Sequence, residues 1–366
     1  MSASSPSQPL RPPSTRLGVW GWMRVNLFNG WFNSLLTVVT VAGLGWVVPP
    51  FLRWAFWDAL WNTPAEACRV GGGACWSVIT KNLRFIIFGF YPHPEQWRPA
   101  VAMGLLVALL WYSKDRRRWK RSLGWIWLVA LVVMGVLMRG GILGLEPVET
   151  SQWSGLPLTL LLSVFGMVAA YPLGVVLALG RRSRLPAVKS LCVAYIELIR
   201  GVPLISLLFM SSVMFPLFLP EGVTVNKILR ALVAIILFTA AYIAEVVRGG
   251  LQAIPRGQYE AAESLGLNYV QTMRLIILPQ ALKIVIPPTV GILISAFKDT
   301  SLVVIIALYD VLNTTKSTLS NPQWMGFSTE AYLFLALLYF LGCFSMSSYS
   351  RRLERELTPG TAGRTR

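Results

Sequence analysis

Residues 231–244 read ALVAIILFTAAYIA, and residues 284–297 read IVIPPTVGILISAF. Between these apolar runs, residues 250–282 read GLQAIPRGQYEAAESLGLNYVQTMRLIILPQAL and are too polar to lie in a membrane. A bilayer core takes roughly 20 apolar residues of helix to cross. We therefore interpret both runs as the centres of membrane-spanning helices joined by a polar loop. Runs this short also fit buried or re-entrant helices.

The polar loop carries clear helix start and stop signals. Residues 255–257 (PRG) break the preceding helix. A short helix is predicted over 259–265, and Gly266 ends it. A second helix is predicted over 269–277, stopping at Pro279. On periodicity alone, this is an ordinary helical hairpin between two spans.

Composition supports a membrane protein. Of the 366 residues, 55% are hydrophobic and 13% charged, and a soluble domain carries about twice that charged fraction. The formal net charge is +17, but most basic residues lie in short runs beside apolar segments. That arrangement orients membrane proteins. A nucleic-acid-binding role is excluded because no basic stripe with interleaved aromatic residues lies outside the predicted spans.

The predicted fold is an all-α polytopic membrane protein with eight spans and both termini in the cytoplasm. The spans are placed at 26–52, 99–113, 122–138, 155–180, 202–220, 231–244, 284–297 and 331–350. This count puts the densest basic runs, 114–121, 181–189 and 351–355, on the cytoplasmic side. Loop 53–98 is then external, and its basic residues are widely spaced.

The chain divides into an extension and a core by composition. Residues 1–25 are predicted to be a disordered cytoplasmic tail without the apolar stretch of a signal peptide. Residues 26–150 form a Trp-rich extension of three spans, whose role is open, and 151–350 form a five-span core. The core contains the cytoplasmic loop 248–282. Residues 351–366 form a second cytoplasmic tail.

The four cysteines suggest one possible bond and no metal site. Cys68 and Cys75 flank RVGGGA in the external loop, where the glycines allow a sharp turn. A disulfide or two free thiols are the alternatives there. Cys192 and Cys343 lie in or beside spans and are interpreted as packing residues. The single histidine, His93, leaves no metal-binding constellation.

The polar loop resembles the EAA signature of ABC importer permeases. The matching residues are Glu260, Ala261, Ala262, Gly266, Ile276, Leu278 and Pro279. The resemblance implies that this loop forms a coupling helix that docks in a groove of a separate ATPase subunit. The chain has no GxxxxGK[ST] loop of its own. It is therefore expected to be no enzyme by itself and to bind no cofactor, with ATP and Mg held by the partner ATPase.

Further segments resemble the polar-amino-acid branch of these permeases. They are IELIRGVPL (196–204), AYIAEVVRGGLQAIP (241–255), LPQALK (278–283) and FKDTSL (297–302). The chain looks closest to a permease of a general L-amino-acid, or a glutamate/glutamine/aspartate/asparagine, importer. The resemblance implies a type I importer core in a bacterial inner membrane that works by alternating access. It also implies an external amino-acid-binding protein and a second, similar permease, with heterodimer and homodimer both open.

Polar residues inside predicted spans are candidates for the substrate pathway, because such residues are costly in a membrane and usually functional. Asp299 or Glu197 is expected to meet a substrate ammonium group. The hydroxyl groups of Thr300 and Ser301 are expected to meet the substrate carboxylate. Glu245 lies at the cytoplasmic end of its span and is a further candidate.

These acidic residues can also have a purely structural role, as members of ion pairs. Lys298 and Asp299 are neighbours and can neutralise each other. Glu197 can pair with Arg200, just before residues 201–203 (GVP), where a helix break is expected. The permease can also lack a strong site of its own if the binding protein selects the substrate.

Two other functions fit this sequence less well than an ATP-driven permease. An ion-driven secondary transporter commonly has duplicated halves with matching broken helices, and none is visible in this sequence. An intramembrane enzyme needs a catalytic constellation, and the sequence supplies neither paired carboxylates nor a Ser/Lys set. Both are therefore disfavoured.

Overall fold

The computed structural model describes residues 18–142 and 144–357, and it is built from helices. Within these residues there is no strand, only isolated bridges between Leu60 and Cys75 and between Gly155 and Asp310. The all-α prediction is confirmed. The α-helices are α1 (Val19–Asn26), α2 (Trp31–Leu52), α3 (Ala65–Val70), α4 (Ser77–Phe88), α5 (Trp97–Ser113), α6 (Arg121–Arg139), α7 (Gly155–Arg181), α8 (Pro186–Gly201), α9 (Leu204–Phe209), α10 (Lys227–Gln252), α11 (Arg256–Ser264), α12 (Tyr269–Gln271), α13 (Leu278–Ile284), α14 (Ile286–Asp299), α15 (Val311–Leu319) and α16 (Ser328–Leu357).

Six helical stretches of the described residues are long and apolar enough to cross a membrane. They are Trp31–Trp57, Ser122–Arg139, Gly155–Arg181, Lys227–Gln252, Ile286–Ile306 and Ser328–Glu356. A seventh span is possible if Pro186–Gly201 and Leu204–Phe218, which meet at a bend of 103°, count as one. The predicted span 99–113 corresponds to α5, which has 17 residues. The structure thus agrees approximately with the predicted eight spans.

The described residues form two compact units, 18–77 and 78–357. In the first unit, α2 has no buried residue and continues through a π-helical turn at Arg53–Trp57. A helix that is apolar on all sides is suited to contact with lipid.

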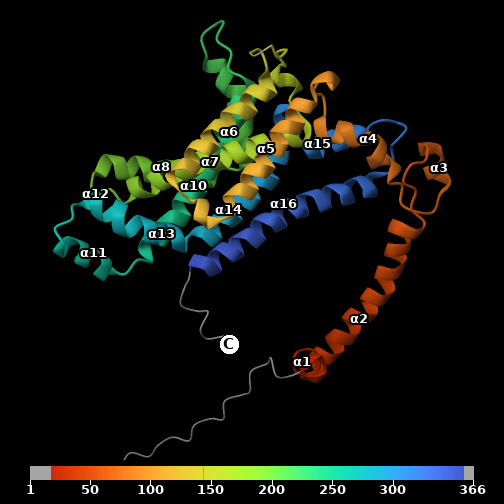
Figure 1. The fold of residues 1–366 in the computed structure, drawn as a ribbon, viewed down its shortest axis with the longest axis horizontal. Coiled ribbons are helices and arrows are strands. Elements are labelled where there is room, and N and C mark those ends of the chain that lie inside the picture. The colour runs from red at the N-terminus through yellow and green to blue at the C-terminus, as the bar shows by residue number, and fades with distance from the viewer. Residues whose placement is uncertain (1–17, 143, 358–366) are drawn as a thin grey trace, which may run out of the picture. The chain divides into compact units, whose positions relative to one another are not determined.

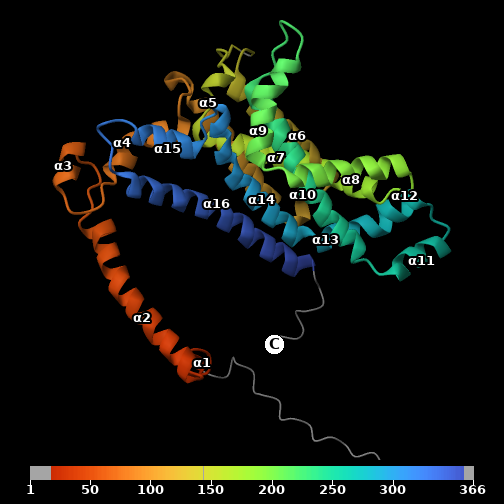
Figure 2. The same cartoon turned by 180° about the vertical axis from the view of Figure 1, so that it is seen from behind.

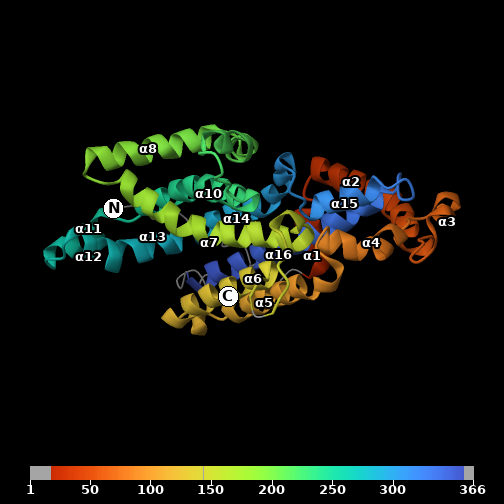
Figure 3. The same ribbon diagram turned by 90° about the horizontal axis from the view of Figure 1, so that it is seen from above.

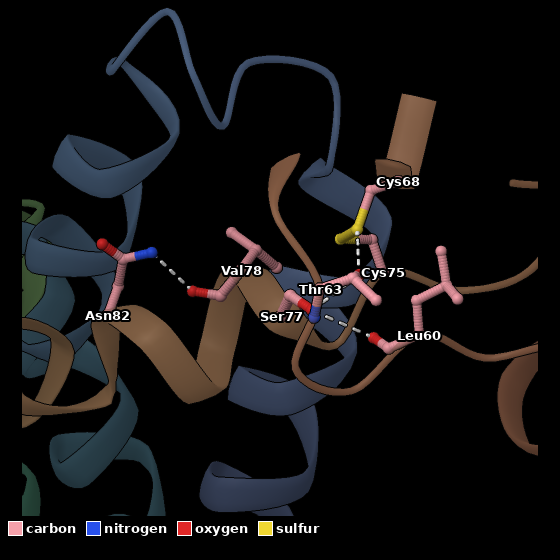
Figure 4. Close-up of a disulfide and its surroundings, with 7 residues drawn as sticks. All are labelled: Leu60, Thr63, Cys68, Cys75, Ser77, Val78 and Asn82. Carbon is pink, nitrogen blue, oxygen red and sulfur yellow. Dashed lines mark hydrogen bonds between the residues drawn. A yellow bond between two sulfur atoms is a disulfide. The ribbon is translucent and has the colours of Figure 1, made fainter. Parts of the chain in front are cut away.

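The loop that follows is held by a disulfide between Cys68 and Cys75 (Figure 4). The Thr63 amide donates to Ser77 Oγ at 2.9 Å, and the indole rings of Trp61 and Trp76 stack with their centroids 5.7 Å apart. These contacts give this short loop a fixed conformation.

The centre of the second unit is the contact between α7 and α10 (Figure 3). Small residues allow the two helices to approach closely. A Cβ atom on Gly174 would lie 2.6 Å from Ile243 Cγ2 and 2.9 Å from the Ala240 carbonyl oxygen. Next to this pair, α8 packs on both helices, α14 packs on both α7 and α16, and α5 and α6 pack together beside α7.

The opposite ends of the second unit carry different elements. Helices α11, α12 and α13 gather at one end, beside the Pro186 end of α8, whereas α4 and α15 lie at the other (Figures 1 and 2). We call the end with α11 and α12 the loop end. It contains the polar segment that the sequence places between two spans.

Several predicted boundaries differ in the structure. Helices α5 and α6, which belong to the predicted extension, bury Ala102, Leu106 and Met134 in a cluster with side chains of α7 in the predicted core. Of the predicted N-terminal tail, 1–17 lies outside the described residues, and α1 occupies most of the rest. Of the predicted C-terminal tail, the part up to 357 continues α16.

Candidate functional site

The polar loop forms α11 and α12 at the loop end. Helix α11 ends at Gly266, whose φ of +71° is the left-handed conformation that glycine adopts without strain. The Gly266 amide donates to the Glu263 carbonyl, and the Leu267 amide donates to the Ala262 carbonyl. The prediction that Gly266 ends this helix is confirmed.

The prediction that a second helix stops at Pro279 is wrong. Helix α12 passes through a π-helical turn at Thr272–Ile277 directly into α13, and Pro279 is the second residue of α13. Pro is tolerated in the first turn of a helix, because its missing N–H is not needed there. The helical path therefore continues past Pro279 to Ile284, and one turn residue, Val285, separates it from the membrane segment that begins at Ile286.

Six of the seven residues that match the EAA signature separate into two sets, and the seventh, Pro279, is exposed in the first turn of α13. Glu260, Ala261 and Gly266 are exposed at the tip, next to Leu265, whose side chain is 75% exposed. Ile276 and Leu278 instead pack against the hydrophobic cluster around α10, and Ala262 is fully buried. The first set forms a free surface, and the second fixes that surface to the spans.

One arginine joins the end of α7 to the exposed helix α11. Arg182 Nη1 donates to the Leu251 carbonyl oxygen at 3.0 Å and to Tyr259 Oη at 3.2 Å. Tyr259 Oη also donates to the Leu251 carbonyl oxygen at 3.3 Å. Three elements, α7, α10 and α11, therefore meet at one guanidinium.

An ionic cluster near the loop end contains two of the predicted pathway residues. Glu245 accepts hydrogen bonds from Arg181 at 2.5 Å and from Arg248 at 2.9 Å, and Arg200 lies 3.6 Å away. Arg181 also pairs with Glu197 at 3.0 Å. The cluster joins α7, α8 and α10. Glu197 and Glu245 are thus neutralised by arginines.

A cavity of about 440 Å³ lies between α10 and α14, and the first residue of α9 closes one side. Its wall includes Phe238, Tyr242 and Gly291, together with the polar residues Thr239, Ser295 and Asp299. Arg200 of the ionic cluster lies over the ring of Tyr242, 5.7 Å from its centroid. The cavity therefore approaches the ionic cluster through Tyr242.

Asp299 supplies a carboxylate to this cavity. Within the described part of the chain it has no ion pair within 4.0 Å, and the charge of its neighbour Lys298 acts on it only from a greater distance. The two neighbouring hydroxyl groups are directed elsewhere. Thr300 is fully buried and donates to the Phe297 carbonyl, and Ser301 donates to the Lys298 carbonyl.

The helix break expected at residues 201–203 is confirmed, since α8 ends at Gly201 and α9 begins at Leu204 after the sharp bend. In the described residues, no three His, Cys, Asp or Glu side chains gather as a metal site. Sequence reasoning missed Arg181 and Arg182. Both belong to a basic run that the sequence explains by membrane orientation alone, and their partners are distant in the sequence.

A helical membrane unit with a cavity between its spans and an exposed loop fixed to those spans has the architecture of a transport subunit. Residues 170–359 match the family described as binding-protein-dependent transport system inner membrane component. The chain therefore belongs to this family and is a permease subunit, as the sequence predicts, with ATPase activity in a separate subunit.

Two known permeases are similar to the chain over nearly its whole length. The inner membrane amino-acid ABC transporter permease protein YhdY of Escherichia coli (strain K12) is 48% identical over 98% of this chain and 97% of its own length. The glutamate/glutamine/aspartate/asparagine transport system permease protein BztC of Rhodobacter capsulatus is 39% identical over 95% and 96%. Among solved structures, an amino acid ABC transporter with histidines is 30% identical, covers 55% of this chain and 92% of its own, and has a TM-score of 0.49.

Proposed function

We propose that this chain moves polar L-amino acids across a bacterial inner membrane as the permease of an ATP-binding-cassette importer. The observation that carries the proposal is the division of the EAA-like residues into an exposed tip and a packed base. A loop built this way transmits a push from a partner to the spans. The names of two relatives similar over nearly the whole chain support amino acids as the substrate class.

The exposed tip is the proposed docking surface for the ATPase, which binds ATP and Mg. Small residues at the tip let a partner backbone come close, and Leu265 offers an apolar contact. The loop end then faces the cytoplasm, together with both chain termini, in agreement with the basic residues at 181–189. An amino-acid-binding protein delivers substrate at the opposite side. A second, similar permease chain completes the pathway, as a heterodimer.

Within the membrane, the proposed substrate contact is Asp299. A carboxylate without an ion pair in a cavity of a span is matched by the ammonium group of an amino acid. Tyr242 and Ser295 line the same cavity, and each carries a hydroxyl group that can donate to a substrate carboxylate. Thr300 and Ser301 have less support as contacts because their hydroxyls bond to backbone carbonyls.

In the proposed alternating-access cycle, the ionic cluster closes the cytoplasmic exit. Arg181 binds Glu197 of α8 and Glu245 of α10, so α7, α8 and α10 cannot separate without breaking these pairs. Arg182 connects the same end of α7 to the coupling helix α11. Movement of α11 by the ATPase is thereby transmitted to the exit.

Uptake of labelled amino acids into proteoliposomes tests the proposal, with the chain, its ATPase and its second permease reconstituted together and the amino-acid-binding protein supplied on the opposite side. We expect ATP-dependent uptake that Gly266→Trp abolishes, whereas Gly266→Asn, which tolerates the left-handed conformation, retains part of it. Uptake that persists without the ATPase would contradict the proposal and favour a secondary transporter. If Asp299→Asn left the rate and the substrate range unchanged, the substrate contact at Asp299 would be refuted separately.

A further inference from the structure

A second hollow of the molecule lies at the loop end, outside the proposed substrate pathway. It is a groove of about 500 Å³ between the turn that joins α7 to α8 and the segment formed by α12 and the following π-helical turn. Its floor is apolar: Leu179 and Leu278 pack on the hydrophobic cluster around α10, and Met273 belongs to that cluster. Arg184 and Arg274 line the groove from its two sides.

The two arginines of the groove are free of partners, unlike their neighbours. Arg181 and Arg182 in the same turn are held by the ionic cluster and by Tyr259. Arg184 and Arg274 are exposed, and in the described residues neither guanidinium group forms an ion pair or a hydrogen bond. The segments 179–190 and 265–278 that form the groove contain no acidic residue. The groove therefore has a positive charge that this chain does not neutralise.

Exposed aliphatic side chains surround these charges. Leu185 is 64% exposed, Val270 67% and Leu275 64%. The groove also lies where α7, one of the membrane-spanning helices, ends. Two free guanidinium groups beside an apolar groove at the end of a span match an amphiphile with a negative head group.

We propose that this groove binds one anionic phospholipid of the cytoplasmic leaflet. Its phosphate lies between Arg184 and Arg274, and an acyl chain covers Leu179 and Met273. The bound lipid links the α7–α8 turn to α12, the helix that follows the coupling helix, and so restrains the base of the coupling loop. The site rests on the proposed orientation of the loop end, but it requires neither a substrate nor an ATPase.

Native mass spectrometry of the purified full-length chain, titrated with cardiolipin, phosphatidylglycerol or phosphatidylethanolamine, tests the site. We expect the wild type to retain the two anionic lipids in preference to the zwitterionic one. Arg184→Gln with Arg274→Gln should weaken anionic-lipid binding roughly 25-fold, from about fivefold for each basic residue beside an anionic lipid. Val270→Trp, which fills the groove without changing charge, should also weaken it.

The matched control is Arg117→Gln with Lys120→Gln. It removes the same charge from exposed positions of another basic segment, neither of which lines the groove. If this control variant and the variant with Arg184→Gln and Arg274→Gln lost anionic-lipid binding equally, the proposal would be overturned, because equal losses would indicate diffuse electrostatic attraction. Equal retention of phosphatidylethanolamine by the wild type would also overturn it. The proposal would also be overturned if Arg184→Gln with Arg274→Gln weakened co-purification of the ATPase while lipid binding stayed unchanged. The groove would then be a protein contact.

Discussion

Arg182 Nη1 lies 3.2 Å from Tyr259 Oη, so the last turn of a membrane span is hydrogen-bonded to the helix that carries the EAA-like residues. The same guanidinium binds the carbonyl oxygen of Leu251, which is 1% exposed. Helix α10 is also held close to the base of the loop. A Cβ atom on Gly250 would lie 2.9 Å from the Ala281 carbonyl oxygen. The coupling helix is therefore connected to two spans at once.

Tyr259→Phe tests this connection, because it removes the hydroxyl group and keeps the ring. We expect a loss of about 1–2 kcal/mol in the free energy of unfolding, because the hydroxyl makes two hydrogen bonds, each typically worth about 1 kcal/mol. We also expect less uptake per ATP hydrolysed. Tyr332→Phe is the matched control, since its hydroxyl has no hydrogen bond in the described part of the chain. Unchanged coupling in Tyr259→Phe would contradict a role for this bond.

The ionic cluster predicts that two similar substitutions, Glu245→Gln and Glu197→Gln, lower the free energy of unfolding by different amounts. Glu245→Gln leaves Arg181, Arg200 and Arg248 without a central anion at a site where the Glu245 side chain is 15% exposed. We expect a loss of about 2 kcal/mol, below the cost of breaking a fully buried pair. Glu197→Gln, where the side chain is 55% exposed, should cost less than about 1 kcal/mol. Thermal unfolding in detergent measures both, and equal shifts would contradict the assigned roles.

The contact between α7 and α10 predicts that Gly174→Ala is destabilising. The new methyl group would overlap Ile243 and the Ala240 carbonyl, and overpacking of this kind costs about 1–3 kcal/mol. Gly249→Ala, in α10, is the control because nothing lies within 4 Å of its added Cβ. There we expect no loss, since Ala favours helix over Gly. Thermal unfolding compares the two, and a smaller effect at Gly174 would show that the helices can separate without cost.

Asp310 predicts a pH dependence of stability. It lies outside the six candidate spans and is fully buried, and this burial raises the pKa of its carboxyl above the usual value of about 3.9. The native state then holds the proton more tightly than the unfolded state. The contribution of Asp310 is therefore most favourable below the unfolded-state pKa, and it is lost as pH rises through the higher native pKa.

Asp310→Asn should remove this dependence. Its unfolding free energy, compared with that of the wild type, should become relatively more favourable as pH rises through the native pKa. Asp115→Asn, at an exposed loop position, provides the comparison. If the difference between wild type and Asp310→Asn did not change with pH, the raised pKa would be refuted.

Local signals in the sequence predicted much of the loop and most spans. Gly266 was recognised because few residues adopt a positive φ, and the structure has +71° there. The break at 201–203 was predicted from Gly and Pro in the same way. The predicted helix end at Pro279 was wrong for two reasons. Pro breaks the interior of a helix but is tolerated in the first turn, and the local sequence pattern does not predict the π-helical turn that precedes Pro279.

The sequence by itself determined the helical membrane class, the approximate spans and the polar loop, because a bilayer demands long apolar helices whatever their neighbours are. Only the tertiary structure decided which of the candidate pathway carboxylates forms ion pairs and which does not. Glu245 meets Arg181 across 64 residues of sequence, whereas Asp299 faces a cavity without an ion pair. It also placed α5 and α6 of the predicted extension against α7. Such contacts depend on how distant helices pack, and neither hydropathy nor charge order specifies that packing.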